Sequence, residues 1–179
     1  VNIIRTALRG ALAGAVLIAI PAYALADEAE SRKACESLAA GHTQTLQAGK
    51  SEWVAASRMP AGPGGGTTEV PAHCLLRVTL DPRPSGVEGV SFGTGIELRL
   101  PLAWNGRLLF QGGGGLNGVL NSALGTVSGF PSALARGFAV VSTDGGHRGR
   151  SAVDSSFAVD QQAKLDFAYQ AVQRTTREA

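Results

Sequence analysis

The feature that most constrains the fold is a continuous apolar run at residues 138–143, which read FAVVST. Gly137 precedes the run and Asp144 follows it, so it has the length of a strand rather than of a helix. A strand whose side chains are apolar on both faces is typical of the central, parallel strands of a sheet. The pattern therefore predicts protein layers on both sides of this strand.

The segments before this run have the patterns of an antiparallel hairpin. Residues 74–80 and 90–100 are strand-like, and residues 81–86 form a turn rich in proline and glycine. In the second strand, apolar side chains alternate with Glu97 and Arg99, which predicts a half-exposed face. We therefore expect an antiparallel start to the sheet.

The remaining segments add parallel strands and helices. Residues 161–176 repeat apolar side chains at the spacing of an amphipathic helix, with Asp160 as its N-cap. The same patterns predict helices at 31–40 and 132–136, a strand at 106–111 and a loop at 62–68. An antiparallel start followed by strand, helix, strand and helix predicts an α/β sheet with parallel central strands.

The first 26 residues have the order of a secretory signal peptide. Arg5 and Arg9 precede an apolar run at 11–26, which ends in small residues at Ala24 and Ala26. Cleavage after Ala26 is the first expectation, and cleavage after Ala24 is the second. The run is shorter than the roughly 20 residues that span a bilayer, so a permanent anchor is the lesser alternative. We expect a secreted or periplasmic protein whose domain covers residues 27–179.

Cys35 and Cys74 are the only two cysteines of the chain. An exported protein meets oxidising conditions, so we expect these two cysteines to form a disulfide. The alternative is a metal site that adds His42 and His73, but the chain lacks the C-x-x-C and H-E-x-x-H spacings. We expect no metal and no cofactor in this chain.

The charge pattern argues against a nucleic-acid partner. The chain has 16 basic and 14 acidic residues, and Arg5 and Arg9 both lie in the leader. The remaining chain is therefore neutral, and the whole chain has only six Phe, two Trp and two Tyr. Neither a basic stripe nor an aromatic stacking surface is present in the sequence.

Four consecutive glycines, Gly112, Gly113, Gly114 and Gly115, directly follow the expected strand at 106–111, and Gly118 comes shortly after. Glycines leave backbone N–H groups unshielded, so an anion or a developing oxyanion can approach them closely. The run lacks the Lys-Ser/Thr of a P-loop. It also lacks the acidic residue expected about twenty positions after a dinucleotide fingerprint. A glycine-rich turn without chemistry remains the alternative.

A second candidate group is Ser142, Asp144 and His147 at the end of the central strand, where sites of α/β sheets collect. A catalytic triad from one tight loop is disfavoured, because known triads draw on separate elements. We expect instead that Asp144 and His147 bond to loop backbone and set its shape. For His42 and His73 we expect surface or structural roles.

Three motifs in this order resemble the tannase and feruloyl esterase family. They are Trp104-Asn105-Gly106-Arg107 leading into the glycines at 112–115 and Gly118, then residues 137–147, and then residues 166–172 with the sequence DFAYQAV. The resemblance covers roughly Cys35 to the C-terminus. It implies a secreted serine esterase of the α/β-hydrolase fold that cleaves small aromatic esters, such as feruloyl and galloyl esters.

The resemblance also implies where the catalytic groups lie. Gly114 and Gly115 would donate to the oxyanion, while Gly112, Gly113 and Gly118 would support the loop. The Cys-Ser-x-Gly-Gly nucleophile motif, its Asp and His partners and a lid domain that often binds calcium are not found in these residues. We therefore expect residues 27–179 to be the N-terminal part of the catalytic domain, ending before the nucleophile strand and inactive alone.

Two other classes of function stay open on the sequence alone. A secreted, non-catalytic module that binds a ligand or carbohydrate would need exposed aromatic side chains, for which Trp53, Trp104 and Tyr169 are the candidates. A nucleotide-binding oxidoreductase would need the acidic ribose ligand that is absent after the glycines.

Overall fold

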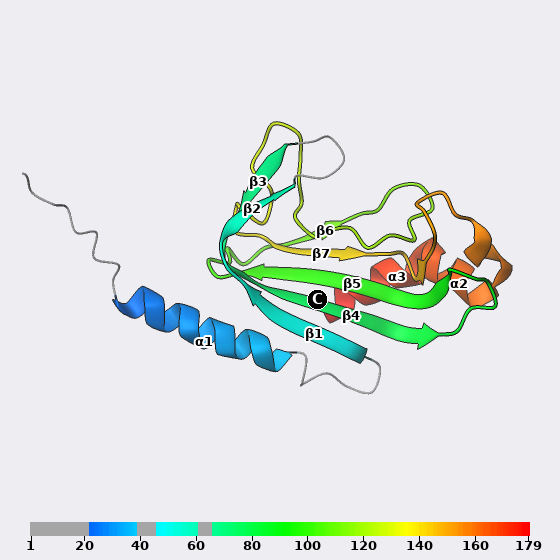
Figure 1. The fold of residues 1–179 in the computed structure, drawn as a ribbon, viewed down its shortest axis with the longest axis horizontal. Coiled ribbons are helices and arrows are strands. Elements are labelled where there is room, and N and C mark those ends of the chain that lie inside the picture. Colours follow the sequence, from blue (N-terminus) through cyan, green and yellow to red (C-terminus); the bar gives the residue numbers. More distant parts are fainter. Residues whose placement is uncertain (1–21, 39–45, 61–65) are drawn as a thin grey trace, which may run out of the picture.

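The computed structural model describes residues 22–38, 46–60 and 66–179, and it consists of one main sheet, one small hairpin, a long N-terminal helix and shorter helices near the C-terminus (Figure 1). The main sheet has six strands, and five of them follow the order β1-β4-β5-β7-β6, with β8 paired to β5. The strands of the main sheet are β1 (Leu46–Val54), β4 (His73–Arg83), β5 (Ser91–Pro101), β6 (Leu108–Gln111), β7 (Ala139–Thr143) and β8 (His147–Arg148). The hairpin pairs β2 (Ser57–Pro60) with β3 (Thr67–Val70).

The sheet is antiparallel from β1 to β7 and parallel between β7 and β6, at its other edge. β1, β4, β5 and β7 pair antiparallel to their neighbours, whereas β6 and β7 run parallel. A parallel pair requires a crossover, and residues 112–138 supply it. The structure thus confirms the predicted α/β sheet, and it places the carboxyl ends of β6 and β7 at the same edge.

The central strand β7 is buried on both faces, as its apolar run predicts. Val140 packs into one apolar cluster together with Leu124 and Leu134 of the crossover, and Val141 packs into another with β4 and β5. Both valines are fully buried. Burial of each such side chain stabilises the fold by roughly 1.5–3 kcal/mol.

The C-terminal helical segment differs in part from the single helix expected at 161–176. Asp160 caps its start, where the carboxylate accepts a hydrogen bond from Ala163 N at 2.7 Å. The segment then contains α2 (Gln161–Leu165), a π-helical turn η3 (Asp166–Gln170) and α3 (Ala171–Glu178). The wider turn places the buried Asp166 against Gly146, and a Cβ at position 146 would collide with the Asp166 side chain. A periodicity of apolar residues does not distinguish this turn from the α-helix around it.

Three expected boundaries are wrong. Strand β4 continues through the expected turn to Arg83, with a register shift after Leu80 that absorbs the bend. Thr67 and Thr68 belong to β3 instead of a loop, because they pair with the β2 strand. Residues 132–136 form a hydrogen-bonded turn instead of a helix, because Gly137 ends it at once with a φ of +82°.

Helix α1 (Ala22–Leu38) starts before the expected helix at 31–40 and is joined to the sheet by a disulfide. Cys35 on α1 and Cys74 on β4 form the expected bond, with Cα atoms 5.5 Å apart. His42 and most of the expected leader lie outside the described residues. Within the part of the chain that is described, no helix has both the length and the apolar character needed to cross a membrane.

Candidate functional site

The glycine run forms an exposed loop at the carboxyl end of β6. Gly112, Gly113, Gly114 and Gly115 are all exposed. The space beside Gly114 is open, because a Cβ built there has no atom within 4 Å. Among the described residues, no acceptor bonds to the N–H of Gly114 or Gly115. These two N–H groups are therefore available to an incoming anion or oxyanion, as the predicted role requires.

A tight turn gives this loop its shape. Asn117 N donates to Gly114 O at 3.0 Å, which closes a four-residue turn. Gly115 takes the second position with a φ of +61°, a conformation that favours glycine. A Cβ at Gly115 would also collide with Ala152 O, and that same oxygen accepts a hydrogen bond from Leu116 N at 2.8 Å. Residue 115 must therefore be glycine for the turn to keep its place.

The turn is attached to the end of β7. The Asn117 side chain donates from Nδ2 to Thr143 O at 2.9 Å, and Gly118 N donates to Asp144 O at 2.9 Å. Sequence reasoning treated Asn117 only as part of the glycine run. Asn117, whose side chain is buried, is therefore a site residue that the sequence analysis did not single out, because an Asn-Gly pair is common in ordinary turns.

Asp144 shapes the neighbouring loop, as predicted. Its Oδ1 accepts hydrogen bonds from Gly95 N at 2.9 Å and from Gly146 N at 3.1 Å. Burial raises the pKa of Asp144 to about 7, although these two N–H groups and Arg148 oppose the shift. Arg148 Nε lies 3.6 Å from Asp144 Oδ2, a separation of an ion pair rather than of a hydrogen bond.

His147 does not have the predicted loop-bonding role. Its ring is fully buried beside an apolar cluster that includes Phe157. The His147 ring stacks on the Phe157 ring with centroids 3.9 Å apart. Neither ring nitrogen has a hydrogen-bond partner among the described residues. Burial lowers the pKa of His147, so the neutral ring is favoured. Ser142 Oγ donates to Asn121 O at 2.6 Å, so Ser142, Asp144 and His147 do not form a triad.

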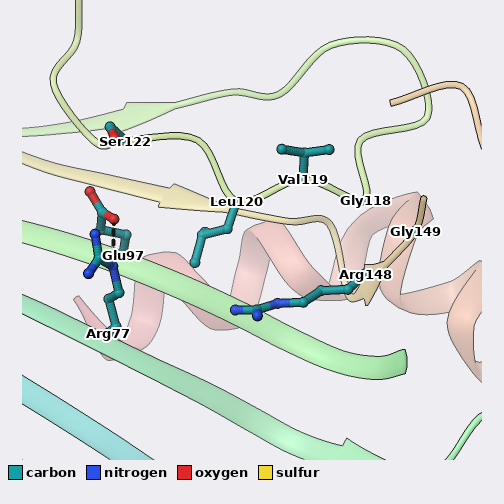
Figure 2. Close-up of a pocket in the computed structure, with 8 residues that line it drawn as sticks. All are labelled: Arg77, Glu97, Gly118, Val119, Leu120, Ser122, Arg148 and Gly149. Atoms are coloured by element: carbon teal, nitrogen blue, oxygen red, sulfur yellow. Dashed lines mark hydrogen bonds and ion pairs between the residues drawn. The ribbon is translucent and has the colours of Figure 1, made fainter. Parts of the chain in front are cut away.

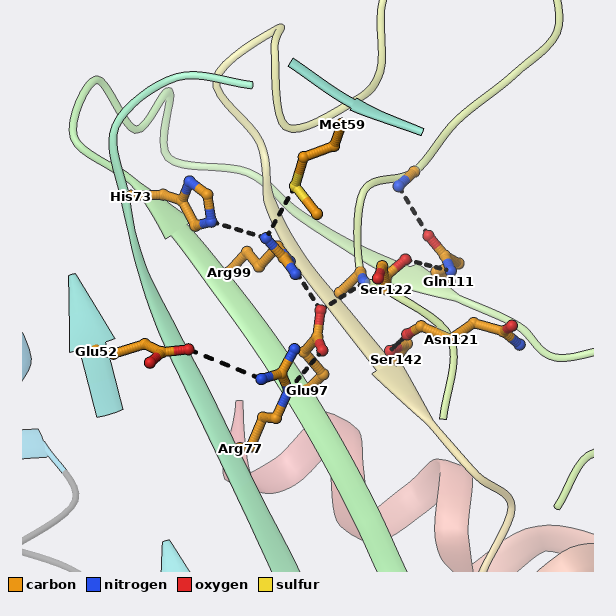
Figure 3. Close-up of polar contacts among 12 residues, drawn as sticks. Glu52, Met59, His73, Arg77, Glu97, Arg99, Gln111, Asn121, Ser122 and Ser142 are labelled. Carbon is orange, nitrogen blue, oxygen red and sulfur yellow. Dashed lines mark hydrogen bonds and ion pairs between the residues drawn. The ribbon is translucent and has the colours of Figure 1, made fainter. Parts of the chain in front are cut away.

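Glu97 and Arg99 are buried, which corrects the expected half-exposed face (Figure 3). Glu97 Oε1 accepts from Arg99 Nε at 2.7 Å and from Ala123 N at 2.9 Å, and its Oε2 accepts from Arg77 Nε at 2.9 Å. Burial alone would raise the pKa of Glu97, but these hydrogen bonds and the Arg99 charge hold it below its usual value. The crossover covers this strand face, and an alternating pattern cannot reveal that cover.

His73 has a structural role at the end of this network. Because Arg99 Nη1 can only donate, His73 Nε2 accepts from it at 2.9 Å. His73 Nδ1 therefore carries the proton and donates to Pro71 O at 2.7 Å. Burial lowers the pKa of His73, and the nearby Arg99 charge acts in the same direction. Among the described residues, no group of three or more potential ligands could hold a metal.

Two of the pockets near these elements contain residues that the sequence singled out or their neighbours. One of about 460 Å³ lies between the sheet and residues 118–122, and Arg148 extends along it toward Leu120 (Figure 2). The other, of about 320 Å³, contains both tryptophans, Trp53 and Trp104, beside the disulfide. The third aromatic candidate, Tyr169, is exposed on η3 and does not line that pocket.

Comparisons with known proteins identify the family of the chain. The sequence model of the family described as "Tannase and feruloyl esterase" matches residues 84–179, more than half of the chain. A mono(2-hydroxyethyl) terephthalate hydrolase of Piscinibacter sakaiensis is 35% identical in an alignment of 159 residues, and the match covers 82% of this chain and 26% of that protein. An uncharacterized esterase of Agrobacterium fabrum is 34% identical in an alignment of 83 residues, and the match covers 44% of this chain and 15% of that protein.

Two solved structures from Aspergillus oryzae share the fold. An esterase superposes with a TM-score of 0.58 at 19% identity, over 81% of this chain and 28% of that one. Feruloyl esterase B superposes with a TM-score of 0.58 at 26% identity, over 80% and 28% of the two chains. This chain thus spans about a quarter of the length of these esterases and has an α/β-hydrolase-type sheet. The motifs, the sheet and the matched residues together show that the chain belongs to the tannase and feruloyl esterase family.

Proposed function

We propose that this chain is the N-terminal part of the catalytic domain of a secreted carboxylic ester hydrolase that acts on aromatic esters. The observation that carries the proposal is the glycine loop at the end of β6, with the N–H groups of Gly114 and Gly115 free of partners in the described chain. In an α/β-hydrolase, one oxyanion donor follows the nucleophile and the other comes from a loop at this place in the sheet. The loop of this chain would supply the second donor.

The nucleophile and its partners are proposed to lie beyond residue 179. The described residues contain no converging Ser-His-Asp group, since Ser142 Oγ bonds to Asn121 O and the His147 ring stacks on Phe157. In the described part of the sheet, β6 pairs on one side only, with β7. Another parallel strand carrying the nucleophile would fit beside β6, where Leu108 is now exposed. This chain alone would then have no turnover.

The aromatic substrate class rests on the relatives. One is named a mono(2-hydroxyethyl) terephthalate hydrolase, and another is feruloyl esterase B. The disulfide is consistent with an oxidising compartment and supports secretion. No step of the proposed hydrolysis uses a cofactor held by this chain, and a calcium ion would belong to a lid domain outside it.

The test is the reaction of the full-length protein with methyl ferulate and methyl gallate. The Gly114→Val variant places a bulky side chain beside the N–H of residue 114 and so blocks the approach to it. The backbone stays unstrained, because open space surrounds that position. The Gly115→Val variant additionally displaces the turn through Ala152. Each change should lower kcat by at least ~100-fold and change KM only a few-fold, because the oxyanion charge exists only in the transition state.

The matched control is Gly86→Val, at another exposed glycine with open space around it and no positive φ. It should leave kcat unchanged. Folded Gly114→Val and Gly115→Val proteins with the wild-type kcat would show that the loop is only a turn.

A further inference from the structure

The side chain of Asn117 lies between two glycines that make room for it. A Cβ at Gly113 would collide with the side-chain amide of Asn117, and that amide supplies the three nearest atoms to the position. A Cβ at Gly145 would stand 3.1 Å from Asn117 Nδ2. Gly113 has no positive φ, so its backbone conformation does not itself demand glycine. The space for Asn117 explains the glycine at 113.

Asn117 connects the turn of the glycine loop to the central strand. Its N–H donates to Gly114 O at 3.0 Å, while its Nδ2 donates to Thr143 O at 2.9 Å. The orientation of the amide is fixed, because the carbonyl of Thr143 can only accept. Asn117 has a φ of +54°, a conformation that asparagine tolerates better than most residues. One residue therefore holds both the turn and its attachment.

We propose that Asn117 is the positioning residue of the oxyanion loop: it sets the direction of the Gly114 and Gly115 N–H groups through the Gly114–Asn117 turn. This inference rests on the proposed function and adds a residue to it. Asn117 does not touch the substrate in this role, because its side chain is buried and directed to β7. A donor displaced by about 1 Å can cost ~10²-fold in rate, so the attachment matters for catalysis.

Two variants of the full-length enzyme test the side chain. Asn117→Gly keeps the positive φ and removes the amide, and Asn117→Asp keeps the shape but places a carboxylate oxygen against Thr143 O. Both should lower kcat by at least ~10-fold on methyl ferulate, while KM changes less than about threefold. The matched control is Asn105→Gly, which removes a similar bond, from Asn105 Nδ2 to Arg136 O at 2.9 Å, and a second one that Asn105 Oδ1 accepts from Arg107 N at 3.0 Å. Both bonds lie away from the glycine loop.

A double-mutant cycle tests the space around the amide. Gly113→Ala alone should lower kcat, because the new methyl group displaces the Asn117 side chain. In the Asn117→Gly background the same change should have little further effect, because the atoms it would strike are gone. Gly86→Ala, at an exposed glycine outside the loop whose Cβ would meet no atom within 4 Å, is the control for adding a methyl group.

Three outcomes would overturn the inference. The first is a wild-type kcat in folded Asn117→Gly and Asn117→Asp enzymes, including the case in which only their melting temperature falls. The second is an equal effect of Gly113→Ala on kcat in the wild-type and the Asn117→Gly backgrounds. If Asn117→Gly does not fold, a wild-type kcat in both Asn117→Asp and Gly113→Ala would overturn the inference instead. The third is a parent enzyme without esterase activity, which overturns the proposed function as well, whereas the first two leave that function standing.

Discussion

Removal of the Glu97 carboxylate tests the buried ionic network that supports the crossover. The carboxylate accepts three hydrogen bonds, from Arg99 Nε, Arg77 Nε and Ala123 N. Arg99 is only 2% exposed, so its charge cannot turn to water when the carboxylate is lost. The neighbours that remain for Arg99 are His73 Nε2 and the sulfur of Met59, and neither carries a negative charge.

The expected loss follows from this burial. Breaking a buried ion pair by removing one partner typically costs about 3–5 kcal/mol, since the other charge stays buried without compensation. The free energy of unfolding of a domain is roughly 5–15 kcal/mol, so Glu97→Ala should remove a large part of it. Replacing both partners, by Glu97→Leu with Arg99→Met, should cost less than Glu97→Ala alone, because no uncompensated charge remains.

Urea unfolding followed by tryptophan fluorescence measures these free energies in the full-length protein. The matched control is Glu52→Ala, which removes a carboxylate 3.7 Å from the same Arg77 but at a site where both side chains are 40% or more exposed. That exposed pair should contribute about 0–1 kcal/mol. If Glu97→Ala cost no more than Glu52→Ala, the network would not be a stabilising connection and the reasoning from burial would fail.

Three further predictions concern pH, the disulfide and activity. Because the folded pKa of Asp144 is about 7 and its ordinary value is near 4, the folded state keeps a proton that the unfolded state has lost between these pH values. The Asp144→Asn variant should therefore gain stability relative to wild type as the pH rises from 4 to 7, on the order of 4 kcal/mol. A difference in urea midpoint between the variant and wild type that is the same at pH 4 and at pH 7 would contradict this. Non-reduced mass spectrometry should find Cys35 bonded to Cys74, a bond that adds about 4 kcal/mol for a loop of this size, and two thiols alkylated without reductant would refute it. The 179-residue chain alone should be poorly stable and should not hydrolyse methyl ferulate or methyl gallate. Turnover of either ester that a serine-directed phosphonate probe abolishes, with the label found on a serine of this chain, would disprove the second expectation.

The parts of the fold that the sequence predicts are those with a local signal. The run at 138–143 is apolar at every face, so its burial on both sides follows without knowledge of its neighbours. Asp160 caps the C-terminal helical segment because an aspartate before an apolar period is a local signal as well. The strands β1 and β2 lack such signals and were not predicted.

The parts that failed depend on contacts between distant segments. Glu97 and Arg99 alternate with apolar residues, as side chains on a solvent-facing side do, yet Ala123 of the crossover covers them. The side chain of His147 was expected to bond to the loop, but Phe157 covers its ring from ten positions away. Such burial arises only when the crossover and the helical segment come to the sheet, so no local pattern reports it.

The attachments of the glycine loop also show which strands hold an active site of the proposed kind in place. Gln111 fastens the crossover where it leaves β6, since its side chain bonds to Ser122 O at 3.0 Å and accepts from Gly125 N at 2.7 Å. Ser142 and Thr143 of β7 hold Asn121 and Asn117 of the same crossover. All these partners belong to the described chain, so the loop has its shape without a strand on the other side of β6. In the proposed enzyme, the oxyanion donors would therefore be held by contacts between the crossover and the strands β6 and β7, and the nucleophile strand would supply none of these contacts.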